Sequence, residues 1–184
     1  MALLHDATIV PSKTELITAW LPSRRWADGL PEIAQFGSYR FDDPAGEVGL
    51  EGVLLRDAAG SVVVHVPLTY RAAPLEGAEQ HLVGTMEHSV LGTRWVYDGP
   101  GDPVFVAAIT AAITSGGTGA EEYFEVDGEK VTREPRVTVR GRGAGDAAGG
   151  AVLHVVRRVG EPVSSAATLT GTWDGGSGVL AALA

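Results

Sequence analysis

The chain has 184 residues, of which 45% are hydrophobic and 20% are charged, a composition typical of one globular domain rather than of a disordered or fibrous protein. It contains no cysteine, which excludes disulfides and thiolate metal sites. The formal net charge of -9 argues against a nucleic-acid partner, because such binding depends on neutralising phosphates.

The first predicted elements are a short strand and a capped helix. Residues 3–10 alternate loosely between apolar and polar, which predicts a strand. Ser12 and Glu15 have the spacing of a capping box, and an apolar stripe at helical spacing follows them. The stripe consists of Leu16, Ile17, Trp20 and Leu21. We expect Trp26, just after the helix, to fold back beside Trp20.

Strands dominate the middle of the chain. They are predicted over residues 33–41, 48–56, 61–71, 80–87 and 94–97. Residues 57–60 form a short hairpin connection. Every second residue of 61–71 is apolar, as in a half-buried antiparallel strand. Pro67 within that run favours an edge position or a bulge.

A second helix and further strands are predicted after residue 101. Asp102 and Pro103 are typical of an N-cap and a first helical residue. Residues 104–114 carry no charge, so we expect a helix that is buried on more than one side, either centrally or against a partner. The remaining predictions are strands over 123–126, 130–132, 136–142, 151–158 and 168–173, a hairpin turn at 127–128, a loop over 143–150 and a helical turn over 179–184.

This order of elements predicts the fold class. Two helices among hairpin-connected strands are typical of an α+β fold with a mainly antiparallel sheet. We find no linker that would divide the chain, so we expect a single domain over residues 1–184.

Motifs that would identify an enzyme are missing. The sequence has no phosphate-binding glycine loop, dinucleotide fingerprint, nucleophile elbow or kinase catalytic loop. The histidines have no metal-ligand spacing, so we expect no metal and no cofactor. We interpret Glu121 and Glu122 as the solvated start of a strand. The sequence therefore favours a protein that is not an enzyme.

One segment, residues 65–99, mixes polar and aromatic side chains densely, as sugar-binding or partner-binding surfaces do. Its candidate binding residues are His65, Tyr70, Arg71, Glu87, His88, Arg94, Trp95 and Tyr97. In the alternative interpretation, the aromatic residues of this set fill a core. A pocket lined by His65, Tyr70, Glu87, His88 and Arg94 would indicate a small-ligand carrier or an enzyme.

Three stretches resemble a known family. The run from Leu16 to Trp26 is similar to the W-L-P-x-x-R-W signature of the maltokinase N-terminal cap domain. The matching residues are Trp20, Leu21, Pro22, Arg25 and Trp26. The run from Val66 to Arg71 is similar to the V-P-L-x-Y-R strand of the same domains. Residues 84–99 resemble the stand-alone, cap-like actinobacterial members. The resemblance extends to about Thr114.

The resemblance implies a curved, cystatin-like antiparallel sheet with helices. In the full enzymes such a cap precedes a two-lobed kinase that phosphorylates maltose with ATP and magnesium. The sequence contains no kinase lobe, so no ATP-binding or catalytic residue is carried over. What the resemblance implies here is a non-catalytic cap-like module in glycogen, maltose or trehalose metabolism. Its partner would be a sugar kinase, a glucan-metabolising enzyme or a carbohydrate.

Location and assembly follow from what the sequence lacks. The chain does not begin with a basic and then apolar leader, and it has no apolar run of the ~20 residues that span a bilayer. We therefore expect a cytoplasmic protein with no membrane partner. A homo-oligomeric scaffold that buries the uncharged helix 104–114 against a second copy is the remaining alternative.

Overall fold

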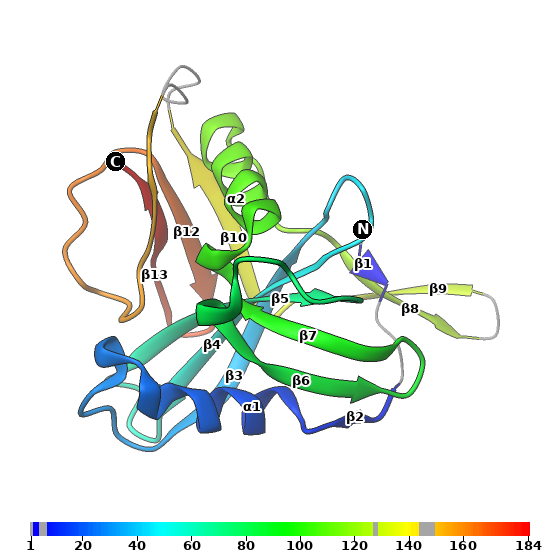
Figure 1. Ribbon diagram of the computed structural model, residues 1–184. Coiled ribbons are helices and arrows are strands. Elements are labelled where there is room, and N and C mark those ends of the chain that lie inside the picture. Colours follow the sequence, from blue (N-terminus) through cyan, green and yellow to red (C-terminus); the bar gives the residue numbers. More distant parts are fainter. Residues whose placement is uncertain (1, 4–6, 127–128, 144–149) are drawn as a thin grey trace.

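The computed structural model describes residues 2–3, 7–126, 129–143 and 150–184 (Figure 1). These residues form two α-helices and three mainly antiparallel β-sheets, so the predicted α+β class is confirmed. No helix within the described ranges has both the length and the apolar character needed to cross a membrane.

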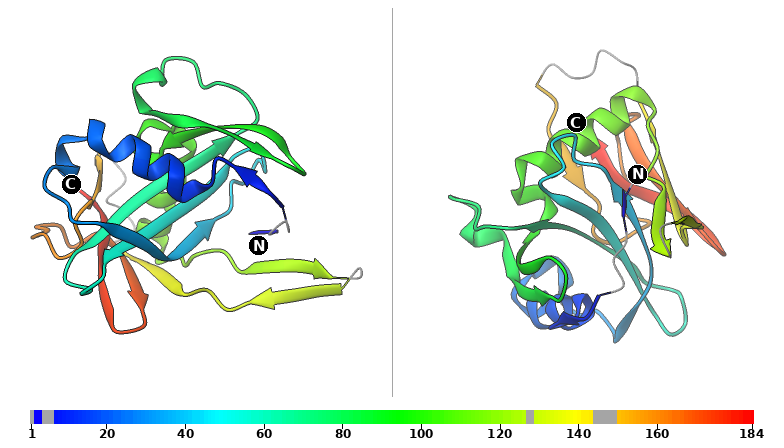
Figure 2. Two further views of the ribbon diagram at one scale, coloured as in Figure 1. Left: turned by 90° about the horizontal axis from the view of Figure 1, so that it is seen from below. Right: turned by 90° about the vertical axis from the view of Figure 1, so that its right-hand side faces the viewer.

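The largest sheet is curved and has the strand order β2-β6-β7-β5-β4-β3, with every neighbouring pair antiparallel (Figure 2). Its strands are β2 (Ile9–Val10), β3 (Ile33–Phe41), β4 (Gly49–Asp57), β5 (Val63–Arg71), β6 (Leu82–His88) and β7 (Gly92–Asp98). The strand predicted from residue 80 begins later, because residues 79–81 form a 3₁₀ turn. The other predicted strands of this sheet are confirmed to within two residues at their ends.

The beginning of the chain contributes one short strand to each of two different sheets. β1 (Ala2–Leu3) pairs in parallel with β8 (Glu122–Val126), whereas β2 pairs with β6. The single strand predicted over residues 3–10 is therefore wrong. β8 and β9 (Glu129–Arg133) pair antiparallel and extend away from the rest of the molecule (Figure 2). The turn predicted at residues 127–128 lies outside the described residues.

The third sheet has the strand order β10-β12-β13-β11. Its strands are β10 (Val137–Arg142), β11 (Leu153–Val155), β12 (Thr168–Trp173) and β13 (Gly176–Leu183). The helical turn predicted over 179–184 is wrong, because β13 pairs with β12 on one side and β11 on the other. β11 covers only part of the strand predicted over 151–158. Residues 144–149 of the predicted loop lie outside the described residues.

α1 (Lys13–Trp20) begins at the predicted capping box. The Ser12 hydroxyl oxygen accepts from the Glu15 N–H at 3.3 Å, and the Glu15 carboxylate accepts from the Ser12 N–H at 2.7 Å. These two bonds satisfy N–H groups that the helix leaves free. As predicted, Trp26 returns to Trp20, with an edge-to-face ring separation of 5.9 Å.

α2 (Pro103–Ser115) begins at Asp102, whose carboxylate accepts from the Val104 N–H at 2.9 Å. It ends at Gly116, whose φ of 72° favours glycine. The helix buries one face, with Phe105, Ile109, Ala112 and Ile113, while Pro103, Ala107, Ala111 and Ser115 are exposed on the other. Burial on more than one side, as a central core helix requires, is therefore not observed.

Two hydrophobic cores lie on the two faces of the large sheet. On one face, α1 packs against alternate residues of the central strands, including Val53, Val64, Val66, Leu68 and Val96. On the other face, α2 and the third sheet pack against Tyr39, Leu50 and Leu54 (Figure 1). The period of two along a strand sends neighbouring residues to different cores.

Pro67 lies in an internal strand without breaking the sheet. No register shift occurs between β4 and β5, so the predicted bulge is absent from this pair. The His65 N–H points away from β4, to the carbonyl oxygen of Arg157, and the nitrogen of Pro67 faces the same way. β7 begins to pair only at Leu68. On that side, residues 157–159 bond to β5 at Val63 and His65 and not at Pro67, so the proline interrupts neither pairing.

Candidate functional site

The predicted pocket residues are divided between the two faces of the large sheet. His65 lies on the α2 face, fully buried, with its ring bonded to Tyr39 and Val156. Tyr70 lies on the α1 face and donates its hydroxyl hydrogen to Glu51 at 2.8 Å. An odd separation along a continuous strand places two side chains on opposite faces, so the two cannot line one pocket.

Three further predicted residues lie at the β6–β7 hairpin. Glu87 accepts from the Thr93 hydroxyl at 2.8 Å, and His88 Nδ1 accepts from the N–H groups of the turn. Arg94 donates to the carbonyl oxygen of Leu91. These contacts hold the hairpin turn together at one end of the sheet, away from His65. The structure therefore does not bring the five residues of the predicted pocket together.

The remaining candidates have structural partners. Arg71 binds Asp102 through two hydrogen bonds of 2.7 Å, and Thr69 donates to the same carboxylate at 2.8 Å. This network fixes the start of α2 to β5. The Tyr97 hydroxyl oxygen is buried and accepts from the Leu75 N–H at 2.8 Å. Trp95 is half-buried on β7, cross-strand from Arg71.

The residues of the first family motif close the end of α1. Trp20 is buried, Leu21 is half-buried, and Pro22 and Arg25 are exposed in the turns that follow. Trp26 lies under the guanidinium of Arg157, whose carbon is 4.8 Å from the ring centre. The motif therefore anchors the helix end to the segment that follows β11.

A buried polar cluster joins α1 to the three strands β3, β4 and β5. Glu51, only 1% exposed, accepts from Lys13 Nζ at 2.7 and 3.0 Å and from the Tyr70 hydroxyl. Arg40 Nη2 is 3.5 Å from the same carboxylate. Burial disfavours the charge of Glu51, but Arg40 and Lys13 outweigh it and lower the pKa of Glu51 to about 2. Both carboxylate oxygens are occupied, so this cluster is structural rather than open to a ligand.

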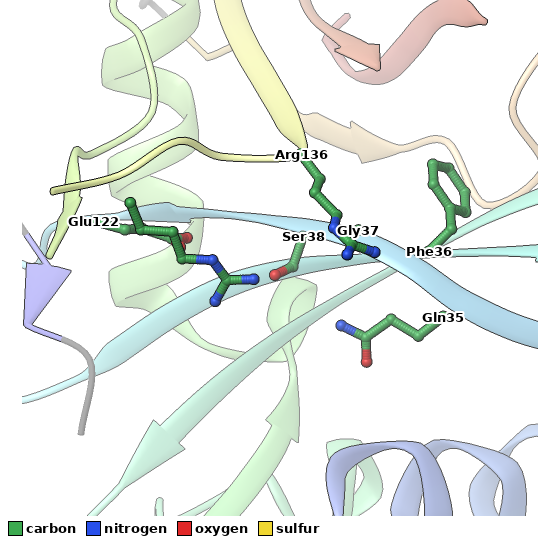
Figure 3. Close-up of a pocket in the computed structure, with 7 residues that line it drawn as sticks. Gln35, Phe36, Gly37, Ser38, Glu122 and Arg136 are labelled. Carbon is green, nitrogen blue, oxygen red and sulfur yellow. The ribbon is translucent and has the colours of Figure 1, made fainter. Parts of the chain in front are cut away.

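A polar cleft lies next to this cluster, along the free edge of β3 (Figure 3). It has a volume of about 260 Å³. Its lining residues are Gln35, Phe36, Gly37, Ser38, Glu122, Arg133 and Arg136. They come from β3, from the start of β8, and from the end of β9 with the turn after it. A smaller pocket of about 170 Å³ adjoins it and shares Glu122.

Close packing of two segments shapes the cleft. At Gly37, an added Cβ would lie 2.6 Å from Val137 Cγ2 and 3.4 Å from Arg136 Cβ. The absence of a side chain therefore lets the start of β10 pack against β3 and places Arg136 at the opening. In Figure 3 the Gln35 and Ser38 side chains lie on the open side of β3, while the Phe36 ring points away from it.

Glu122 corrects an interpretation drawn from the sequence. Its side chain is not solvated, because the residue is only 4% exposed. Arg40 Nε is 3.9 Å from Glu122 Oε1, within ion-pair range but beyond hydrogen-bond distance, and no other described residue bonds to this oxygen. No local pattern distinguishes it from the exposed Glu121; the pairing of β8 and the proximity of β3 bury it.

The described residues that line the cleft offer both hydrogen-bond acceptors and hydrogen-bond donors. Three or more His, Cys, Asp or Glu side chains placed as metal ligands are not found in the described part of the chain. The arginines, the amide, the hydroxyl and the buried carboxylate can hold a polar ligand through several hydrogen bonds.

The comparisons with known proteins concern the first part of the chain. Residues 20–102 match the maltokinase N-terminal cap domain. The match begins at Trp20, within the first motif, contains the Val66–Arg71 motif, and ends at the N-cap of α2. It confirms the resemblance drawn from these motifs over this segment. No curated protein gives a significant match.

Proposed function

From the match of residues 20–102 to the maltokinase N-terminal cap domain, we propose that the chain is a non-catalytic accessory module in glycogen, maltose or trehalose metabolism. The family match is the observation that carries this proposal. The module acts in the cytoplasm by binding a sugar kinase, a glucan-metabolising enzyme or a carbohydrate.

The exposed face of α2 supports a protein partner. Pro103, Ala107, Ala111 and Ser115 are exposed and uncharged, whereas the opposite face is fixed to the core. Small uncharged side chains allow a partner to approach closely without desolvating a charge. The helix also starts at Asp102, where the family segment ends, so a partner bound there would lie beside the cap domain.

The test is recovery of a partner by the tagged full chain from its own host lysate, identified by mass spectrometry. We expect a sugar kinase or a glucan-metabolising enzyme to co-elute. An Ala107→Glu, Ala111→Glu double variant should lose it, and Ala59→Glu, in the exposed hairpin connection 57–60, should keep it. Recovery of no such enzyme, or equal recovery with the α2 variant, would count against this mode of action.

Self-association through the same helix face is the second possibility. A second copy could cover α2 symmetrically, as homo-oligomer interfaces commonly do. Light scattering after size-exclusion chromatography distinguishes the two: a monomer removes the scaffold alternative, whereas a dimer that dissociates in the α2 double variant supports it.

A further inference from the structure

We propose that the cleft along the free edge of β3 binds a small hydroxylated oxyanion, of the chemical class of a sugar phosphate. The inference deepens the proposed function and rests on it for the choice of a sugar. The cleft itself extends beyond the family segment, because Glu122, Arg133 and Arg136 follow residue 102.

Two arginines provide the site for the oxyanion. Arg133 and Arg136 both line the cleft, and neither forms an ion pair with another described residue. In a chain with a net charge of -9, these two arginines concentrate positive charge at one opening. The planar guanidinium donates paired hydrogen bonds that fit phosphate and carboxylate oxygens.

Glu122 requires that the ligand also carry a hydrogen-bond donor. Glu122 lines the cleft, and its Oε1 is buried without a hydrogen-bond partner among the described residues. Buried acceptors are almost always bonded, and leaving one unpaired has a free-energy cost. A second anion beside this carboxylate would be repelled, whereas a hydroxyl group would donate a hydrogen bond to the carboxylate. The ligand therefore combines an oxyanion with hydroxyl groups.

The size and the lining restrict the ligand further. A volume of about 260 Å³ lies just below the ~300–1,000 Å³ of drug-sized sites, which fits one sugar ring rather than a glucan chain. Phe36 is the one aromatic among the described lining residues, and its ring is already in contact with Trp173, 5.8 Å away, and with the Arg56 guanidinium, 4.7 Å away. Gln35 and Ser38 add neutral polar groups that can bond further hydroxyls.

Isothermal titration of the full chain tests the proposal with four probes: glucose 1-phosphate, gluconate, glucose and inorganic phosphate. We expect glucose 1-phosphate or gluconate to bind more tightly than glucose or phosphate alone. Whichever of these two sugar-bearing anions binds more tightly shows whether the site prefers a phosphate or a carboxylate group. Arg136→Ala and Glu122→Gln should each weaken binding about tenfold or more, because each removes a charge-assisted hydrogen bond. Arg142→Ala is the matched control, since Arg142 is exposed on β10 and does not line the cleft.

The binding measurements distinguish a specific site in the cleft from its absence. Loss of binding in Arg136→Ala with retention in Arg142→Ala, both folded by circular dichroism, supports the site. No binding of any probe, or inorganic phosphate binding as tightly as the sugar-bearing anions, overturns it. The partner-recovery experiment depends on the α2 face, so failure of either test leaves the other result standing.

Discussion

The Tyr39 hydroxyl and Nε2 of His65 are 2.9 Å apart, and both side chains are buried. Tyr39 is on β3 and His65 on β5, so the phenol crosses β4 to reach the imidazole. It passes over Gly52, where an added Cβ would lie 2.1 Å from Tyr39 Cζ. On its other side, His65 Nδ1 is 3.2 Å from the carbonyl oxygen of Val156. A carbonyl only accepts, so Nδ1 carries the proton and Nε2 accepts from the tyrosine.

This neutral histidine makes stability depend on pH. Burial, and after it the charge of Arg157, lowers the pKa of His65 to about 3. In the unfolded chain the histidine pKa is about 6.5, so the unfolded state takes up its proton first as the pH falls. The contribution of His65 is therefore fully present above about pH 6.5 and is lost progressively towards about pH 3.

Urea unfolding from pH 7.5 to pH 4.5 measures this effect. The free energy of unfolding of the wild type should fall with an added slope of about 1.4 kcal/mol per pH unit below about pH 6.5. His65→Gln removes the titrating group, so this variant should be less stable at pH 7.5 but should show a shallower slope. Equal slopes would show that His65 does not cause the loss of unfolding free energy at low pH.

The buried Glu51 cluster gives a second prediction. Glu51→Gln leaves Lys13 and Arg40 without their carboxylate, and removing one charge of a buried pair typically costs about 3–5 kcal/mol of unfolding free energy. Tyr70→Phe removes one hydrogen bond and leaves the charges paired, so it should cost only about 1–3 kcal/mol. Chemical denaturation of the two variants at pH 7 gives the comparison.

The Glu51 cluster should affect the free energy of unfolding at lower pH than His65 does. The folded pKa of Glu51 is lowered to about 2, and an unfolded glutamate titrates near about 4.3. Its stabilisation is therefore present above about pH 4.3 and is lost as the pH falls towards about 2. Asp102, whose pKa is also lowered, titrates in the same direction. The difference between wild type and Glu51→Gln should shrink below about pH 4; a constant difference would contradict the assignment.

The contact between α2 and β10 depends on Gly141. An added Cβ would lie 1.9 Å from Ala112 O and 2.8 Å from Ile113 Cα, which are backbone atoms of α2 and cannot rotate away. Gly141→Ala should therefore push the helix off the sheet and cost about 3 kcal/mol or more. Arg140→Ala, exposed on the other side of the same strand, should change stability by less than about 0.5 kcal/mol. Thermal and urea unfolding of both variants measure the difference.

Asp102 links the sheet to the same helix. Its carboxylate accepts from Thr69, from Arg71 twice and from the Val104 N–H. Asp102→Ala removes the N-cap and leaves Arg71 without its partner, so it should cost about 3–5 kcal/mol. Asp102→Asn keeps an acceptor for the helix N–H and should cost less. Similar losses in the two variants would show that the charge pair, rather than the cap, dominates.

The helices were predictable because their signals are local. The capping box of Ser12 and Glu15 and the Asp102-Pro103 pair act within three residues of the helix start. The sequence also indicated which face of β5 each side chain occupies, since His65 and Tyr70 lie five positions apart, an odd number. That parity alone could have excluded a shared pocket. The family motifs were sufficient to identify the segment that the comparison confirms.

Long-range contacts decided the rest. Residues 179–184 have the composition of a helical turn, yet β13 forms because strands β11 and β12 offer hydrogen bonds on both sides. Glu122 resembles its neighbour Glu121 in sequence, but only Glu122 is covered. The β3 cleft combines residues of β3 with Arg133 and Arg136, nearly a hundred positions later, so no spacing rule could have found it.

The sequence by itself determined the α+β class, the two helix starts, most strands and the family resemblance of residues 20–102, because periodicity, capping and motif residues are properties of short segments. Only the tertiary structure decided which side chains share a face, which carboxylates are buried and where a cleft opens. Those depend on strand order and on the close approach that Gly37, Gly52 and Gly141 permit between distant segments. That approach is a matter of packing across the fold, and no local pattern specifies it.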